Sequence, residues 1–311
     1  MFFKKPDPTP RGVPLADLEA ALEPTTLRTT RKGDTLIVQH EKLTTHIEVM
    51  APANIEHETD PISAIVTLKT ALPREFSRIA KSPELISSIN SMASLGAVTE
   101  ENGQYFIGSR LTVFEGEEAW NVQFPLILFT VIGGIDSILG ASRRIFTNEP
   151  PKGGNSDWSE ADIELVVSYL SRISFCNGGG QRLTAEFSLK PDAVSAMAGD
   201  HDTALWQITS DQPHPELGGG LFCLLQLPHQ IEDGEKLDRI IGDLNRMEMA
   251  PHDLPPHFGA WCRGNMGNNP AYVSFLPNAL HSAEGIAINV SIWAAHRAQW
   301  ADAMLTSLGV R

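Results

Sequence analysis

Short runs in which apolar and polar residues alternate are the dominant pattern along the chain. In the first half, runs rich in Val, Ile, Leu and Thr cover residues 35–40, 44–50 and 62–72. In the second half, comparable runs cover residues 182–189, 203–209 and 220–227. A period of two residues is typical of antiparallel strands with one buried face. We therefore predict three antiparallel strands in each half.

Segments with helical spacing separate these groups of strands. Residues 14–22 place Leu15, Leu18 and Leu22 on one face before Pro24, and the second half opens with Asp157, an N-cap candidate three positions before Glu160. Further helices are predicted at residues 84–92 and 239–247, and a terminal helix in each unit includes residues 135–146 and 291–308. Further strands are predicted at 104–114, 257–263 and 271–276. Each half thus predicts an α+β unit in the order helix, three strands, helix, two or more strands, helix.

The two halves also match in sequence around their middle helices. With one fixed offset of 155 residues, identical residues coincide at Leu72 and Leu227, Pro73 and Pro228, Ile86 and Ile241, Asn90 and Asn245, and Met92 and Met247. The agreement of element order with these identities favours an internal duplication. Prolines, glycines and small polar residues gather at 148–156. We therefore predict a first unit at residues 1–147, a linker at 148–157 and a second unit at 158–311.

This element order, the acidic balance of the chain and the spacing Ile86 to Asn90 and Ile241 to Asn245 resemble the type III secretion chaperone fold and its YbjN relatives. Chaperones of this family are usually single units that pair as homodimers. The resemblance therefore implies a tandem duplication that acts as an intramolecular dimer and binds a protein or peptide.

Charge and composition narrow the range of partners. The formal net charge is −14, which disfavours binding to nucleic acid or to anionic membrane surfaces and favours a basic partner. The short basic clusters Arg28-Arg31-Lys32 and Arg143-Arg144 are typical of solvated faces. Three widely spaced cysteines and a proline-rich N-terminus predict a soluble, cytoplasmic protein without a secretory signal. The most apolar stretch, residues 124–135, is about eight residues shorter than the ~20 that span a bilayer.

Motifs for catalysis, metal binding or cofactor binding do not emerge from the spacings. The segment containing His252, Asp253 and His257 is interrupted by prolines, which preclude the helical spacing of a zinc protease. The glycine clusters at 178–180 and 218–220 lack the order of a phosphate-binding loop and precede predicted strands. We therefore predict no metal, no cofactor and no catalytic residue.

The leading interpretation is a non-enzymatic protein-binding protein, monomeric or homodimeric, that holds its partner by strand addition or in a helix-binding groove. Within the apolar segments 124–139 and 292–308, the partner-binding candidates are Phe124, Leu126, Leu128, Trp293 and Trp300. Two alternatives stay open. One is a hydrolase or transferase with a site between the units that uses His252, Asp253, His257 and Cys262, and the other is a purely structural pseudo-dimer that assembles further.

Overall fold

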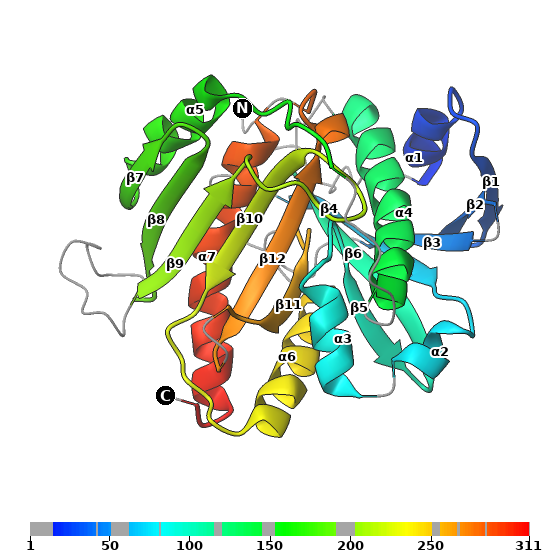
Figure 1. Ribbon diagram of the computed structural model, residues 1–311. Helices are drawn as coiled ribbons and strands as arrows, with labels where there is room; N and C mark the ends of the chain where they lie inside the picture. Colours follow the sequence, from blue (N-terminus) through cyan, green and yellow to red (C-terminus); the bar gives the residue numbers. More distant parts are fainter. Residues whose placement is uncertain are drawn as a thin grey trace, which may run out of the picture.

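The chain forms two six-stranded antiparallel sheets with helices packed on them, as Figure 1 shows. The computed structural model describes residues 15–41, 43–50, 62–80, 82–114, 120–144, 153–190, 203–250, 256–265, 268–283 and 285–310. The predicted α+β class, with two similar units that each contain an antiparallel sheet, is confirmed.

The first unit contains these elements in chain order: α1 (Leu15–Leu22), β1 (Arg28–Lys32), β2 (Thr35–His40), β3 (Leu43–Met50), β4 (Ile62–Ala71), α2 (Phe76–Ile79), α3 (Pro83–Asn90), β5 (Ala97–Glu101), β6 (Gln104–Phe114) and α4 (Trp120–Arg144). The second contains α5 (Glu160–Leu170), β7 (Phe175–Gly179), β8 (Arg182–Ser188), β9 (Thr203–Thr209), β10 (Gly220–Gln226), α6 (Gly234–Met249), β11 (Ala260–Arg263), β12 (Pro270–Pro277), the short 3-10 helix η2 (Asn278–Leu280) and α7 (Ile286–Ser307).

The two sheets have the same topology. Their strand orders are β1-β2-β3-β4-β6-β5 and β7-β8-β9-β10-β12-β11. Strands β1 and β7 are additions to the three predicted before each middle helix, and each lies at the outer edge of its sheet. Each is joined to the next strand through a two-residue turn that begins with a glycine at positive φ, Gly33 at 60° and Gly180 at 62°. The shared topology supports the duplicated unit.

Helices cover one face of each sheet and enclose the core. Helices α1 and α4 pack on the first sheet, and α5 and α7 occupy the corresponding positions on the second. One apolar cluster contains residues of both units, such as Leu18, Leu128, Trp206 and Leu305. The two sheets therefore share a continuous core.

The structure refines two predicted helices. Helix α5 begins at Ser159, whose hydroxyl accepts from the Asp162 backbone while the Asp162 carboxylate accepts from the Ser159 N–H, so Ser159 replaces Asp157 as the N-cap. Helix α4, predicted to include residues 135–146, extends from Trp120 to Arg144 and so also contains the apolar stretch 124–135. Its segment Gln123–Gly140 is long and apolar enough to cross a membrane by length and composition, and 61% of it is buried against the rest of the chain.

Candidate functional site

The middle helices α3 and α6 pack against each other where the two units meet, and each closes the inner edge of a sheet. Asn90 on α3 accepts from the Val98 N–H at 2.8 Å and donates to the Val98 carbonyl at 3.2 Å. Asn245 on α6 makes the same pair of bonds with Trp261, at 2.8 and 2.9 Å. Both asparagines are buried. Each asparagine amide thus makes the two hydrogen bonds that a neighbouring strand would otherwise make with the edge residue of β5 or β11.

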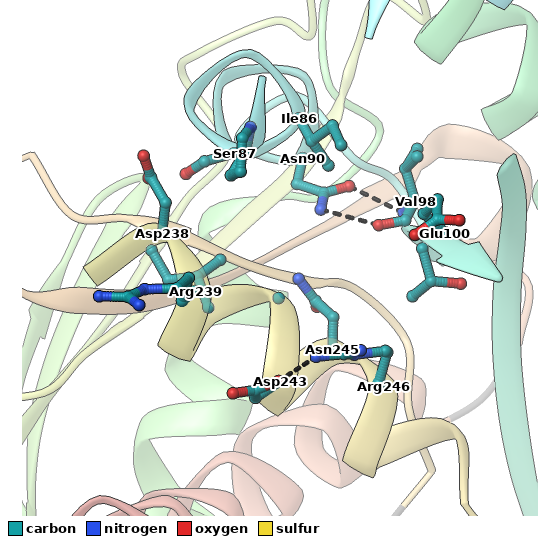
Figure 2. A pocket seen from close by; sticks show the side chains of 14 residues that line it. Ile86, Ser87, Asn90, Val98, Glu100, Asp238, Arg239, Asp243, Asn245 and Arg246 are labelled. Atoms are coloured by element: carbon teal, nitrogen blue, oxygen red, sulfur yellow. Dashed lines mark hydrogen bonds and ion pairs between the residues drawn. The ribbon is translucent and has the colours of Figure 1, made fainter. Parts of the chain in front are cut away.

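A pocket of about 310 Å³ lies between these helices and β5, as Figure 2 shows. Helix α3 lines it with Pro83, Ile86, Ser87 and Asn90, and the equivalent positions of α6, at the offset of 155, line it with Asp238, Ile241, Gly242 and Asn245. Val98, Thr99, Glu100, Arg239, Asp243 and Arg246 complete the described lining. The pocket therefore forms at equivalent surfaces of the two units.

A difference between the units opens this pocket. The Arg263 N–H of β11 donates to the Ser87 hydroxyl of the other unit at 2.9 Å. Glu100 of β5 is the counterpart of Arg263, since each lies two residues beyond the strand residue that an asparagine holds. Alternate residues of a strand direct their backbone groups to the same side, so the Glu100 N–H faces α6. There Ser87 is matched by Gly242, and a Cβ at Gly242 would meet no atom within 4 Å.

The pocket combines apolar and charged lining residues. Ile86, Ile241 and Val98 supply apolar surface. Asp238 is held by Arg263 through two bonds of 2.8 and 2.7 Å, and Asp243 pairs with Arg246. The described lining includes no histidine, cysteine, lysine or tyrosine, and the Ser87 hydroxyl in it accepts from the Arg263 backbone N–H.

A buried ionic cluster lies beside the pocket and joins the units. Glu248 on α6 accepts from Arg297 Nε at 2.6 Å and from Trp261 Nε1 at 3.2 Å. His257 Nδ1 lies 3.6 Å from the Glu248 carboxylate and 3.0 Å from the Tyr272 hydroxyl. From the first unit, Arg110 Nε donates to the Glu248 carbonyl at 2.8 Å. Arg110 and His257 also exchange backbone bonds of 2.7 and 3.3 Å.

The electrostatics of this cluster favour a permanent ion pair. Burial alone would raise the pKa of Glu248, but the charges of Arg297, His257 and Arg110 lower it to about 2. Burial raises the pKa of Tyr272. Neither described pocket includes a side chain of the cluster. The structure therefore places His257, one of the residues named for an enzymatic site, in a sealed structural network.

The other residues named for that alternative do not converge on His257 in the described part of the chain. Cys262 is buried in a small apolar cluster, and burial raises its pKa to about 12, which suppresses thiolate formation. His252 and Asp253 lie outside the described residues. Among the residues described, no group of three or more His, Cys, Asp or Glu side chains has the arrangement of a metal site.

The predicted partner-binding residues lie in or against the core. Phe124 and Leu128 are fully buried in it, and Leu126, Trp293 and Trp300 are partly buried and pack against it. Their role in partner binding stays a prediction, and in this conformation Phe124 and Leu128 contact only the interior.

The exposed apolar surface gathers instead at a corner that sequence patterns did not indicate, formed by α5, the following turn and β7. Of the seven exposed large hydrophobic side chains among the described residues, four lie here: Leu165, Tyr169, Ile173 and Phe175, with 52%, 42%, 55% and 66% exposure. In the sequence, the available signal was an aromatic residue, Phe175, close to the glycine-rich segment 178–180. The residues around it lack the alternation of apolar and polar positions that would predict a strand with one buried face.

Replacing Gly242 with serine tests the origin of the pocket between the middle helices. Gly242→Ser restores the residue found at the equivalent position 87 and gives the Glu100 N–H an acceptor. We expect the free energy of unfolding to rise by about 1 kcal/mol or more, from helix propensity and the new bond. Gly133→Ser on α4 is the control, because its Cβ also meets nothing within 4 Å but faces no strand edge. Equal gains in urea unfolding would contradict the assignment.

Replacing Glu248 with glutamine tests the ion pair. The variant leaves Arg297 without its counter-charge, so we expect a loss of about 3–5 kcal/mol near neutral pH. The folded pKa of Glu248 lies below its ordinary value, so its stabilisation is present above about pH 4.5 and is lost as the pH falls toward about 2. The difference between wild type and Glu248→Gln in urea unfolding should therefore shrink over that window.

The control for that experiment is Glu235→Gln, an exposed carboxylate on the same helix, with an expected loss below about 1 kcal/mol. A difference between wild type and Glu248→Gln that does not change as the pH falls from 5 to 3 would show that Glu248 is not held ionised by the cluster.

Comparisons with known proteins identify no relative of this chain by sequence. No family model matches it, and no curated protein matches it. A solved structure that aligns with it is DynU16, a protein in the dynemicin biosynthetic locus, with 9% identity, coverage of 88% of this chain and 82% of that chain, and a TM-score of 0.12. These comparisons assign the chain to no family.

Proposed function

We propose that the chain is a non-enzymatic polypeptide-binding protein whose second unit takes an extended, basic segment of a partner along the edge of β7. The observation that carries this proposal is an unprotected strand edge beside exposed apolar side chains. Strand addition uses such an edge, since main-chain hydrogen bonds supply affinity and alternate side chains supply selectivity.

The outer edges of the two sheets differ in protection, although they are equivalent in topology. Strand β1 carries Arg28, Arg31 and Lys32, all exposed, and charged side chains of this kind discourage pairing with another strand. Strand β7, with the sequence FCNGG, carries no charge and pairs only with β8 among the described strands. Its backbone is therefore the more accessible template for an added strand.

An exposed aromatic side chain on one face of this edge would cover the added segment. Phe175 lies beside Glu186 of β8 on the face of the sheet away from α5. Leu165 and Tyr169 are one helical turn apart on α5, and Ile173 lies in the turn between helix and strand. Exposed aromatic and aliphatic side chains grouped in this way mark interaction surfaces in soluble proteins.

Charge favours a basic segment over a second copy of this chain as the occupant. Two copies would each bring a net charge of −14, and their repulsion opposes self-association. An extended basic segment is attracted by the same field, and Glu186 lies next to Phe175 to pair with it.

The resemblance to type III secretion chaperones and YbjN proteins supports the same class of function, as a proposal. So does the distribution of reactive groups, because Cys223, Cys262 and His257 are buried away from the described pockets. The three cysteines are free thiols, which fits the reducing, cytoplasmic compartment that we propose for this protein.

Peptides selected on the wild-type chain, and then measured for their affinity for Phe175→Ser, test the proposal. Peptides selected from a displayed library on the wild-type chain should be extended, basic and apolar, and should lose about thirtyfold in affinity for Phe175→Ser, because an exposed aromatic anchor is removed. Methylating alternate backbone nitrogens of a selected peptide should abolish binding, and amide exchange should slow in Phe175–Gly179 but not in Arg28–Lys32.

The matched control is Phe129→Ser on α4, since Phe129 is also exposed, at 39%, but lies in the other unit. Equal affinity of the selected peptides for wild type and Phe175→Ser would refute docking at β7. A concentration-dependent dimer in sedimentation that Phe175→Ser dissolves would replace the partner segment with a second copy of the chain.

A further inference from the structure

The inner edge of β5 has one residue whose outward backbone groups are left without a partner. Residues two apart on a strand direct their N–H and carbonyl groups to the same side, so those of Glu100, like those of Val98, point away from β6. Asn90 binds both groups of Val98, but no described residue binds those of Glu100 on this side. The turn at Asn102 and Gly103 then ends the strand. The free edge is therefore one residue long.

The equivalent position in the second unit shows how such an edge residue is satisfied inside the protein. The Arg263 N–H donates to the Ser87 hydroxyl at 2.9 Å. The matching position opposite Glu100 is Gly242, where a Cβ would meet no atom within 4 Å. Glu100 and Gly242 both line the pocket of about 310 Å³ in Figure 2, a volume in the range of small-molecule sites. The pocket thus occupies the place of a hydrogen-bonding side chain.

The three carboxylates of the described lining already have partners. Arg263 binds Asp238 through two bonds of 2.8 and 2.7 Å, and Asp243 pairs with Arg246. The Glu100 carboxylate accepts from a backbone N–H of the turn that follows β5. An anionic ligand would be repelled by these three groups. The groups left for a ligand are therefore one backbone donor and one backbone acceptor, which favour a neutral ligand that has both an acceptor and a donor.

We infer that this pocket binds a primary carboxamide, whose oxygen accepts from the Glu100 N–H and whose NH₂ group donates to the Glu100 carbonyl. The protein uses the same group at the neighbouring edge residues, since the amides of Asn90 and Asn245 each bind both backbone groups of one residue. Pro83 and Ile86 of α3 supply apolar surface for an aliphatic stem. An added strand does not fit, because it needs a longer free edge.

The carboxamide comes from a glutamine or asparagine side chain of a polypeptide or from a free aliphatic amide. The inference does not depend on strand addition at β7, because β7 is the outer edge of the other sheet.

The test titrates the full chain with isovaleramide while its backbone amide NMR signals are recorded. Isobutyl methyl ketone, which has a methyl group in place of the NH₂ donor, and isovalerate, which has a charge, are the matched controls. The amide should shift the Glu100 signal saturably and bind about fivefold or more tightly than either control, since only the amide makes both bonds. The Arg263 signal should stay unchanged, because its N–H is already bonded to Ser87.

A second titration distinguishes the two sources of the carboxamide. It uses Nα-acetyl-glutamine methylamide, with Nα-acetyl-norleucine methylamide as the control that lacks the side-chain amide. Tighter binding of the glutamine compound than of isovaleramide identifies a polypeptide side chain, and equal or tighter binding of isovaleramide identifies a free amide.

Gly242→Ser tests the position of the site. The new hydroxyl should accept from the Glu100 N–H, so the affinity for isovaleramide should fall about tenfold or more while the protein stays folded. Gly133→Ser should bind like the wild type, because Gly133 lies on α4 outside the described pockets. The inference is overturned if isovaleramide does not shift the Glu100 signal saturably, if either control compound binds as tightly, or if Gly242→Ser binds like the wild type.

Discussion

The hydrogen-bonding groups at the edges of the two sheets set the main constraint on this molecule. A sheet with six strands has two edges, and every buried N–H and carbonyl along them needs a partner. At the inner edges the partners are side chains, because Asn90 and Asn245 each hold both backbone groups of one strand residue. These bonds bring a middle helix across each edge, so the two helices can pack together and join the units. The buried cluster around Glu248 forms in the same region, where Arg110 of the first unit reaches the backbone of α6.

Duplication makes the differences between the units informative. Ser87 closes its side of the interface by accepting from Arg263, while Gly242 leaves a pocket opposite Glu100. The outer edges diverge in the same manner, since β1 carries three cations and β7 carries an exposed phenylalanine and glycines. When equivalent positions of the two units carry different residues, the shared fold alone does not explain the difference. We therefore propose partner binding at the edge of β7, where the copies diverge.

The sequence predicted the parts of the fold in which burial is one-sided. Strands such as β2, β8 and β9 alternate because one face meets the core. Strands β1 and β7 escaped prediction because most of their side chains are exposed on both faces, which leaves no alternation to detect. The offset of 155 singled out Asn90 and Asn245 as identical residues, but their role depends on contacts with strands that follow them at different distances along the chain. No local signal marked the pocket between α3 and α6, because it forms only where the two units meet.

The buried cluster around Glu248 shows that polar composition alone does not make a catalytic site. Glu248, Arg297, His257 and Tyr272 resemble catalytic machinery in composition, yet each charge is neutralised by a neighbour and burial excludes substrate. Catalysis needs a group that can change its protonation near neutral pH within reach of a ligand, and a carboxylate held ionised down to about pH 2 lacks that capacity. Binding requires the opposite arrangement, in which polar groups lack internal partners and face an accessible space. We propose that the edge of β7 in the second unit provides that arrangement, while the first unit retains a charged outer edge. Fusing two copies thus lets one sheet expose its edge while the shared core and the inner asparagines maintain the fold.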